Sequence, residues 1–302
     1  MNGYLSPLYA ASLAEFGSPL HLAESDGWLL LRPIAESTER DAIGCYPLFN
    51  CHNWHALGAD LDHLASRAVS VSLVVDPFAA IDSVRLCDWF PDVCRPFKEH
   101  AVIDFSREWR QSICPHHRRN IRAAARRVEV ERCQDPAVWL ETWTGLYANL
   151  VARHEIRGMA RFSRESFSRQ LAVPGVTVFR AVVGTETVGM LLWYVAERAA
   201  YYHLGAFSPL GYASRAAFAL FDVALGDLAA RGVQLCTLGA GAGWQAAKED
   251  GLSRFKNGWA NDSRTAWFCG RILAPAKYER LTAARQLPQA EYFPKYRQRE
   301  AA

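Results

Sequence analysis

Apolar and polar residues near the start of the chain alternate with the period of β-strands. Residues 20–25 and 28–34 are two such segments, and they flank Asp26-Gly27. This dipeptide favours the positive φ angles of a two-residue turn, so the pattern predicts a β-hairpin.

The rest of the first hundred residues is predicted to contain helices and strands in turn. A helix over 79–90 is expected to face inward with Ile81, Val84 and Trp89. One further helix and two strands are predicted over 56–65, 69–75 and 97–105.

Beyond residue 128 the pattern predicts the order strand, helix, helix, three strands, helix, strand, helix and strand. The first of these helices begins at Asp135-Pro136, because aspartate caps a helix and proline fits its first turn. Trp143 and Leu146 belong to its apolar face. The later strands are predicted over 176–183, 188–195, 199–206, 233–238 and 263–272.

Residues 198–259 are the most informative stretch of the sequence. They read as a strand, a glycine-containing loop, a helix, a second strand and a glycine-rich exit. This arrangement directs the N-terminus of a helix, with its free amides, toward an anionic ligand.

Length and composition indicate an α/β protein with room for two domains. The chain has 302 residues, 50% of them hydrophobic, and a net charge of only +3, which does not by itself require nucleic acid as a partner. A polar segment over 107–115 precedes a change in composition. We therefore expect two domains, over 1–106 and 107–302.

The eight cysteines include no Cys-x-x-Cys pair. Neither a disulfide framework nor a metal site is therefore predicted, and free thiols in a reducing cytoplasm are expected. The N-terminus does not look like a secretory signal, and no segment is long and apolar enough to span a membrane. The C-terminal residues 288–302 are charged and aromatic, and we expect them to be loosely ordered.

Three sequence blocks connect this order of elements to a known superfamily. They are Arg-Arg-Asn-Ile-Arg-x-Ala at 118–124, Tyr-Tyr-His-Leu-Gly-Ala at 201–206 and Gly-Leu-Ser-Arg-Phe-Lys-Asn-Gly at 251–258. With them the chain resembles the GNAT N-acyltransferases, and specifically the Fem-type branch. The resemblance implies an α/β fold of two tandem GNAT-like units, each a mixed β-sheet flanked by helices, with the second unit catalytic.

The resemblance also implies how a donor is held. Backbone amides of the strand bind the acyl carbonyl, and the following loop cradles the pyrophosphate of acyl-CoA, which points to Leu204, Gly205, Ala206, Ser208, Gly211, Tyr212, Ala213, Ser214 and Arg215. This loop keeps only one glycine of the usual pattern, which is also true of the Fem-type branch, whose members use aminoacyl-tRNA. If Gly211 admits the phosphates, a bulky residue there is expected to abolish donor binding without loss of the fold.

Four residues are candidates for catalysis. His203, with Tyr201 and Gly205 on the same side of its strand, is either the base for the attacking amine or a hydrogen-bonded core histidine. Tyr201 is either a packing residue or the acid for the leaving group. Lys256 matches the lysine of the Fem-type Phe-Lys motif, which implies a role near the acceptor or the reacting carbonyl, and Asp250 either pairs with it or caps the turn.

Two further groups are candidates for substrate binding. The resemblance places His154 and Glu155 where GNAT enzymes often reach the acceptor, although an exposed helix end explains both equally well. Arg118, Arg119 and Arg122 either bind the phosphates of tRNA or form the solvent-exposed face of an amphipathic helix.

The leading hypothesis is therefore a cytoplasmic N-acyltransferase that moves an acyl group from acyl-CoA to a small or carrier-linked amine without a metal. An aminoacyl-tRNA-dependent transferase is the nearest alternative. A catalytically inactive GNAT-like scaffold is the alternative from another class.

Overall fold

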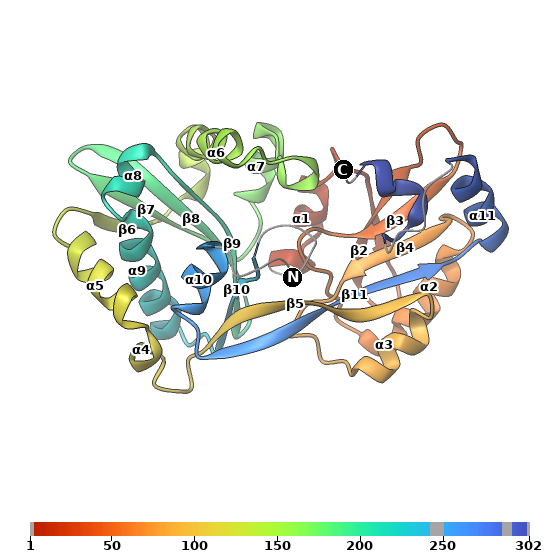
Figure 1. Cartoon of the computed structure of the whole chain (residues 1–302), viewed down its shortest axis with the longest axis horizontal. Helices are drawn as coiled ribbons and strands as arrows, with labels where there is room; N and C mark the ends of the chain where they lie inside the picture. The colour runs from red at the N-terminus through yellow and green to blue at the C-terminus, as the bar shows by residue number, and fades with distance from the viewer. Residues whose placement is uncertain (1–2, 242–250, 286–291, 301–302) are drawn as a thin grey trace. The chain divides into compact units, whose positions relative to one another are not determined.

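The computed structural model describes residues 3–241, 251–285 and 292–300 (Figure 1). The contacts divide the chain into two compact units. Unit 1 comprises Met1–Leu8 and Glu99–Arg264, and unit 2 comprises Tyr9–Lys98 and Thr265–Ala302. The division of the chain at residue 106 stays a prediction, and the contacts add that the C-terminal segment belongs to the same unit as residues 9–98.

Unit 1 contains a mixed sheet in the order β5-β10-β9-β8-β7-β6. β9 and β10 run parallel, and the other neighbours are antiparallel. The strands are β5 (Val93–Asp104, of which the second half lies in unit 1), β6 (Glu129–Cys133), β7 (Val176–Val183), β8 (Glu186–Ala196), β9 (Ala199–Phe207) and β10 (Leu235–Gly239).

Helices cover both faces of this sheet (Figure 1). On one face the fully buried Leu220, Phe221 and Leu225 of α9 pack in the main core of the unit. On the other face Trp143 and Tyr147 of α6 contact Phe167 of α7. The helices are η1 (Gly3–Leu5), α4 (Trp109–Ser112), α5 (Pro115–Ala124), η3 (Pro136–Trp139), α6 (Leu140–His154), η4 (Gly158–Ala160), α7 (Arg164–Gln170), α8 (Pro209–Ala213), α9 (Ala216–Ala230) and α10 (Gly251–Asn257).

In unit 2 the strands lie in the order β1-β2-β3-β4-β11, and this part of the sheet is also mixed. β3 and β4 are parallel and the other neighbours are antiparallel. The strands are β1 (Ser18–Leu22), β2 (Gly27–Pro33), β3 (Arg40–Gly44), β4 (Ser70–Val74) and β11 (Asp262–Ile272, of which most lies in unit 2). The predicted fold class, α/β with mixed β-sheet flanked by helices, is confirmed.

The predicted hairpin is present, but its turn is longer than expected. Leu22 pairs directly with Gly27, so the loop has four residues, and Asp26 alone adopts a positive φ of 52°. Gly27 is instead the first residue of β2, where a Cβ atom would lie 2.8 Å from that of Cys51. Close packing, and not a turn, requires this glycine.

The prediction for α3 of unit 2 is wrong at one of its three inward residues. Ile81 and Trp89 do pack against the core of the unit, but Val84 is 71% exposed and the buried residue of the helix is Leu86. The helix begins one turn later than predicted, because the Asp82 side chain caps it by accepting a hydrogen bond from the Arg85 amide. The helices are α1 (Pro7–Ser12), η2 (Trp54–Ala56), α2 (Leu57–Leu64), α3 (Ser83–Trp89), α11 (Pro275–Ala284) and η5 (Lys295–Glu300).

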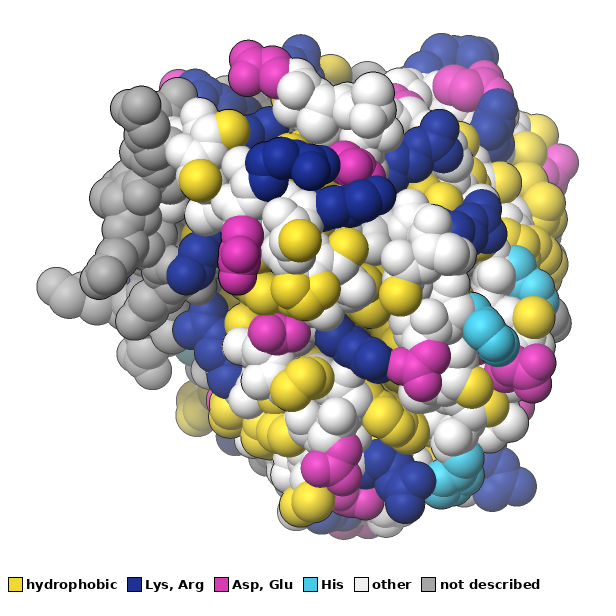
Figure 2. All heavy atoms as spheres, turned by 90° about the vertical axis from the view of Figure 1, so that its right-hand side faces the viewer, with side chains coloured by type: hydrophobic (Ala, Val, Ile, Leu, Met, Phe, Trp, Pro, Cys, Tyr) yellow, Lys and Arg dark blue, Asp and Glu magenta, His cyan; other side chains and the backbone are white. Residues whose placement is uncertain are grey.

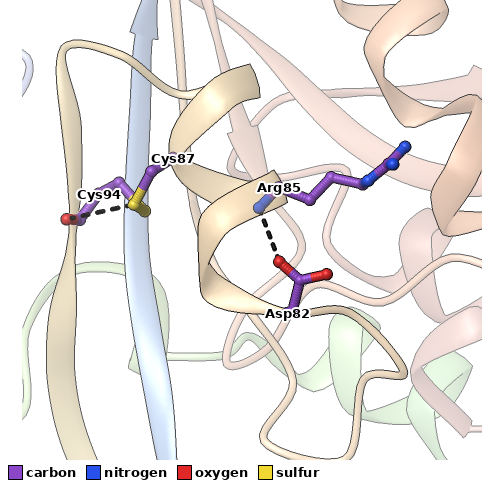
Figure 3. The surroundings of a disulfide bond; sticks show 4 residues. All are labelled: Asp82, Arg85, Cys87 and Cys94. Carbon is purple, nitrogen blue, oxygen red and sulfur yellow. Dashed lines mark hydrogen bonds between the residues drawn. A yellow bond between two sulfur atoms is a disulfide. The ribbon is translucent and has the colours of Figure 1, made fainter.

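The expectation of free thiols throughout is wrong for one pair. A disulfide joins Cys87 of α3 to Cys94 at the start of β5, seven positions along the chain (Figure 3). The spacing carried no signal, because only the chain reversal between the helix and the strand brings the two cysteines together. The other six cysteines are free.

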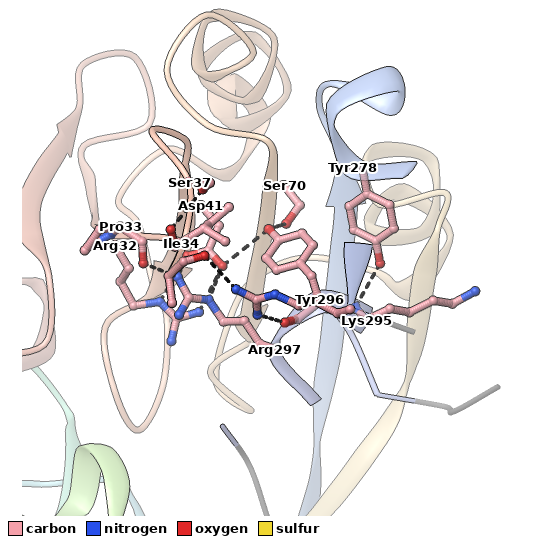
Figure 4. Close-up of polar contacts among 12 residues, drawn as sticks. Arg32, Pro33, Ile34, Ser37, Asp41, Ser70, Tyr278, Lys295, Tyr296 and Arg297 are labelled. Carbon is pink, nitrogen blue, oxygen red and sulfur yellow. Dashed lines mark hydrogen bonds and ion pairs between the residues drawn. The ribbon is translucent and has the colours of Figure 1, made fainter. Parts of the chain in front are cut away.

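The C-terminal segment of unit 2 is ordered in its described part, contrary to expectation. Tyr296 is fully buried, and Arg297 forms an ion pair with Asp41, whose side chain is 1% exposed (Figure 4). Arg32 contacts the same carboxylate, and the Arg297 guanidinium also donates to the Pro33 carbonyl at 2.7 Å. One buried carboxylate thus joins β2, β3 and η5.

The surface charge of the protein is mixed in sign. Figure 2 shows one face of the molecule, on which basic and acidic side chains are interspersed among apolar ones. In unit 2 several of the exposed charges pair with each other, as Lys277 and Arg280 do with Glu39. Over the described ranges, no helix is both long and apolar enough to cross a membrane.

Candidate functional site

The parallel strands β9 and β10 of unit 1 separate partway along their length. Their pairing runs only from Leu235–Ala199 to Thr237–Tyr201, although β9 continues to Phe207. Beyond Tyr201 this edge of β9 is therefore not used by β10, and Tyr202, Leu204 and Gly205 are partly exposed. We call the stretch 202–206 the splayed edge of β9.

A β-bulge at His203 sets the direction of the side chains on the splayed edge. Leu192 of β8 pairs with Leu204 while Trp193 pairs with Tyr202, which leaves His203 as the extra residue. The predicted alternation is therefore wrong after His203. A Cβ atom on Gly205 would meet the Tyr202 hydroxyl, so Gly205 shares the face of Tyr202 and not that of His203.

His203 is buried within a hydrogen-bond relay of protein groups. Its Nε2 donates to Gln170 Oε1 at 3.0 Å, since the Gln170 amide nitrogen is directed to Ser166. Its Nδ1 then accepts from the Tyr4 hydroxyl at 3.1 Å. Burial lowers the pKa of His203 to about 3, so the ring is neutral at physiological pH.

Stability is expected to depend on pH through His203. The pKa is lowered from 6.5 to about 3 on folding, so between these values the unfolded chain binds a proton that the folded chain excludes. The free energy of unfolding should therefore fall as pH decreases across this window, by up to about 1.4 kcal/mol per pH unit. Urea unfolding at several pH values should show this slope, and a His203→Asn variant should show a shallower one.

A His63→Asn variant, which replaces an exposed histidine, serves as the control and should keep the slope. His117 is also buried and its pKa is also lowered by burial, so part of the acid sensitivity will persist in both variants. An unchanged slope in the His203 variant would contradict the assignment.

Tyr201 lies on the same face as His203 and is also buried. Its ring and that of His203 both meet the Tyr4 ring edge to face. Tyr4 comes from the N-terminal η1 helix, whose Gly3 amide donates to the Pro174 carbonyl. Tyr4 and Gln170 could not be found from local sequence patterns, because 199 and 33 positions separate them from His203.

The predicted phosphate loop, 208–215, is folded into the short helix α8. Ser208 caps this helix by accepting from the Gly211 amide, while the amides of Tyr212 and Ser214 bond to carbonyls within the segment. Ala213 and Tyr212 are exposed, and Arg215 takes the left-handed conformation just before α9. Since α9 begins without a side-chain cap, its first-turn amides are the ones best placed for an anion.

Gly211 is buried against the backbone of β8. A Cβ atom there would collide with the Val188 carbonyl oxygen, which cannot move without disturbing the strand. The expectation that Gly211 can be replaced without loss of the fold is therefore wrong. A Gly211→Ala variant should be destabilised by about 1–3 kcal/mol, measured by thermal or urea unfolding; a variant as stable as the parent would show that this contact relaxes freely.

Lys256 of α10 is buried and faces the space between the separated strands. Its ammonium group donates to the Ala240 carbonyl at 2.7 Å, and it lies 5.8 Å from the centre of the Tyr202 ring. Lys256 is also one of the residues that line a cavity of about 280 Å³. Asp250, the predicted partner of Lys256, lies outside the described residues.

The cavity is lined entirely by unit 1, and most of its residues were not predicted. They come from β5, β10, α10 and the start of β11, and are Glu99, His100, Ala101, Gly239, Ala240, Gly241, Ser253, Lys256, Asn257 and Ser263. His100 is buried and its Nδ1 lies 3.1 Å from the Thr237 hydroxyl. The described residues contain no group of three histidine, cysteine or carboxylate side chains able to hold a metal.

The predicted acceptor residues lie at the end of α6. His154 is its last residue and Glu155, with a φ of 48°, ends it in the left-handed conformation. Both are exposed. The adjacent Arg153 lies over the ring of Tyr212, 4.3 Å from its centre, which brings this helix end next to α8.

The predicted basic residues form the exposed side of α5. Arg118, Arg119 and Arg122 are exposed, and none of them pairs with an acidic group in the described part of the chain. On the buried side His117 donates to the Phe255 carbonyl at 2.8 Å and its ring covers Gly258, where no Cβ atom fits. The packing of α5 against α10 thus gives a structural reason for residues near the block at 118–124 and within the block at 251–258.

Comparison with known proteins gives similarities of domain and fold. Residues 115–257 match the family described as acetyltransferase (GNAT) domain. FemX has a similar structure (TM-score 0.62, 12% identity, 84% of this chain and 86% of that one), as has L-PGS from Bacillus licheniformis (0.56, 12%, 90% and 94%). The C-terminal domain (DUF2156) of a protein named as a lysylphosphatidylglycerol synthetase of Agrobacterium fabrum is also similar (0.65, 14%, 89% and 90%). No curated protein sequence matches the chain.

Proposed function

Since residues 115–257 match the acetyltransferase (GNAT) domain and the chain has a fold similar to that of FemX, we propose that the protein is an N-acyltransferase. The observation that carries this proposal is the splayed edge of β9. There the backbone of Leu204–Ala206 lies outside the ladder with β10. The Tyr202 ring, at the start of this edge, has its centre 5.8 Å from the ammonium group of Lys256, which also lines the cavity. An acyl carbonyl placed at this edge would meet backbone amides, and an amine that enters past Lys256 would have access to it.

The proposed reaction forms one bond and breaks another. The amine nitrogen attacks the acyl carbonyl carbon, the new C–N bond forms, and the bond from carbon to the sulfur or oxygen of the donor breaks. The amine loses a proton and the departing thiolate or alkoxide gains one. Amides directed at the transient oxyanion are worth about 10²- to 10³-fold each in turnover, and positioning supplies much of the rest.

His203 fits a positioning role in this proposal better than that of a base. Its two ring nitrogens are engaged by Tyr4 and Gln170, and burial keeps it neutral. The hydrogen bonds of His203 to Tyr4 and Gln170 hold the β-bulge in place, and the bulge sets the direction of the residues along the splayed edge of β9. Tyr201, buried against the same Tyr4 ring, supports that geometry.

Acyl-CoA is the donor that we propose first. The uncapped N-terminus of α9 follows directly after β9 and α8, and its partial positive charge suits a pyrophosphate group. Arg215 is exposed at the same point. In this arrangement most of the amides that bind the pyrophosphate come from the start of α9. The residues from Ser208 to Ser214 would form the wall of the donor site.

Aminoacyl-tRNA is a second candidate donor, and one observation favours it. Arg118, Arg119 and Arg122 present three exposed positive charges along α5, which also packs on α9. A tRNA donor requires several phosphate contacts, so its binding would weaken steeply with salt.

One experiment tests the function and separates the two donors. The protein is incubated with acetyl-CoA or with charged tRNA and a pool of amines, and products are identified by mass spectrometry. We expect an N-acylated product with acetyl-CoA, and little change in a variant with Arg118, Arg119 and Arg122 replaced by glutamine. Dependence on charged tRNA, with loss of turnover and of salt sensitivity in that variant, would identify the second donor instead.

A variant with Arg271, Lys277 and Arg280 replaced by glutamine removes three positive charges from unit 2 and serves as the control. It should behave like the parent with either donor. Absence of product with every donor would overturn the transferase proposal and favour an inactive scaffold.

A further inference from the structure

A thiol and an imidazole form a close pair at the start of α5. The Cys114 sulfur lies 3.0 Å from Nδ1 of His117, three positions along the chain. Cys114 is the residue just before the helix, and Pro115 occupies its first position. Neither Cys114 nor His117 lines the cavity or belongs to the splayed edge of β9. The pair is therefore a group of reactive side chains that the proposed acyl transfer does not use.

The second ring nitrogen of His117 determines how the pair is hydrogen bonded. Nε2 lies 2.8 Å from the Phe255 carbonyl oxygen, which can only accept, so Nε2 carries the proton. Burial lowers the pKa of His117 below its usual 6.5, so the ring is neutral at pH 7. Nδ1 is then an acceptor, and the Cys114 thiol donates to it. A nucleophile, a base and a group that orients the base thus follow one another in a single chain of hydrogen bonds.

Packing holds the imidazole in this orientation. His117 is 3% exposed, and its ring lies 5.0–5.2 Å from the centres of three aromatic rings on α9, on α10 and just after α10. These rings belong to Phe218, Phe255 and Trp259. The ring also covers Gly258, whose carbonyl accepts from the Cys114 amide at 2.9 Å. The base therefore cannot turn away from the thiol without disturbing α9 and α10.

The surroundings of the pair favour a negative charge on the sulfur. α5 begins without a side-chain cap and has no acidic residue in its first turn, so its free amides present a partial positive charge. His116 and Arg118 of this turn and Arg254 of α10 are exposed and basic. On α9, Asp222 pairs with Arg110 at 2.9 Å. A thiolate that forms as Cys114 reacts is thus stabilised by its helix.

Cys114 differs from the other five free cysteines in its exposure. It is partly exposed, whereas those five are buried. They are Cys45, Cys51, Cys133, Cys236 and Cys269. Burial raises the pKa of the Cys45 thiol to about 12 and that of Cys133 to about 11, which keeps both protonated at pH 7. Since the thiolate is the nucleophile, a reagent in solution meets one reactive thiol among the six.

We propose that Cys114 is a site of reversible thiolation, at which His117 is the base and a low-molecular-weight disulfide is the reagent. The Cys114 sulfur attacks one sulfur of the reagent, the new S–S bond forms, and the S–S bond of the reagent breaks. Its second sulfur leaves with the electron pair. The thiol proton passes to Nδ1 of His117 and then to the departing thiolate. Cys114 is oxidised and half of the reagent is reduced, and a free thiol reverses the reaction.

Mass spectrometry of the protein incubated with glutathione disulfide tests the site without any acyl donor or amine. We expect one adduct, mapped to Cys114 by proteolysis and removed by reduced glutathione. Cys114 should react at least about tenfold faster than N-acetylcysteine amide at pH 7, since a positioned base contributes about 10²-fold or more in an optimised site. The five buried cysteines should react only in urea. An adduct that forms first at one of them, or a rate at Cys114 no higher than that of the free thiol, would overturn the proposal.

A variant of the base assigns the role of His117. In His117→Gln the amide can still donate to the Phe255 carbonyl but offers Cys114 no basic nitrogen, so the adduct should form about tenfold more slowly at pH 7. His116→Gln, which replaces the exposed neighbouring histidine, is the matched control and should react like the parent. Circular dichroism checks the fold of both. If His117→Gln does not fold, the rate of the parent relative to the free thiol decides. Equal rates in the parent and a folded His117→Gln variant would overturn the proposal.

Discussion

A Gly205→Val variant is expected to lose about two orders of magnitude in kcat/KM for acyl transfer, because small displacements of reacting groups cost that much. Gly205 lies on the splayed edge of β9, and a Cβ atom there would collide with the Tyr202 hydroxyl and lie 2.8 Å from Leu191 Cδ2. Both obstacles are ends of side chains. They can rotate away, so the fold should persist while the Tyr202 ring, which lies next to Lys256, is displaced.

Steady-state kinetics and circular dichroism together check this expectation. Gly145→Val is the matched control, since Gly145 lies in α6 with open space around its Cα and should tolerate the same change. Gly211→Ala provides the contrast, because its clash is with backbone and should appear in stability. Full activity of a folded Gly205→Val variant would show that the acyl group is not held at this edge.

The sequence predicted the elements of unit 1 well because local signals specify them. Asp135-Pro136 opens η3 and leads into α6, and Ser163 caps α7 by accepting from the Ser166 amide. The apolar spacing that predicted Trp143 and Leu146 on the inner face of α6 is confirmed, since both are buried. The resemblance to the GNAT superfamily is supported by the match of residues 115–257 to the acetyltransferase (GNAT) domain, and FemX has a similar fold.

The interior of the site was less predictable, for two physical reasons. A β-bulge leaves no mark in the period of a strand, so the direction of Gly205 was predicted wrongly even though its strand was found. Contacts across the chain, such as Tyr4 with His203 or His100 with Thr237, depend on which strands become neighbours. Single residues such as Lys256 were found only because a known motif includes them.

The same limit applies to unit 2, where a buried ion pair joins residues 256 positions apart. Nothing in the local sequence of Asp41 or Arg297 distinguishes them from surface residues. Their burial follows from the docking of η5 against β2 and β3. The C-terminal segment was expected to be loose because its composition is charged, and the structure shows that one of these charges is a buried anchor.

Removing Arg297 is expected to destabilise the protein by about 3–5 kcal/mol, because the buried Asp41 carboxylate would keep only one of its two arginine ion pairs. The Asp41 side chain is 1% exposed, and after Arg297→Met only Arg32, Tyr296 and water remain as candidates to satisfy it. Urea unfolding measures the loss. Asp41→Leu alone should be similarly harmful, since it leaves two guanidinium groups without their carboxylate.

The double variant Asp41→Leu with Arg297→Met should recover much of that loss, because two apolar side chains replace a desolvated ion pair. Asp62→Asn is the matched control. The Asp62 side chain is 67% exposed, so its ion pair with Arg271 should contribute less than about 1 kcal/mol to the free energy of unfolding. Raising the salt concentration should weaken the exposed pair more than the buried one, since solvent ions screen only what they can reach. If Arg297→Met changes stability no more than Asp62→Asn does, η5 is not anchored by this carboxylate, and the aromatic packing of Tyr296 must hold the segment instead.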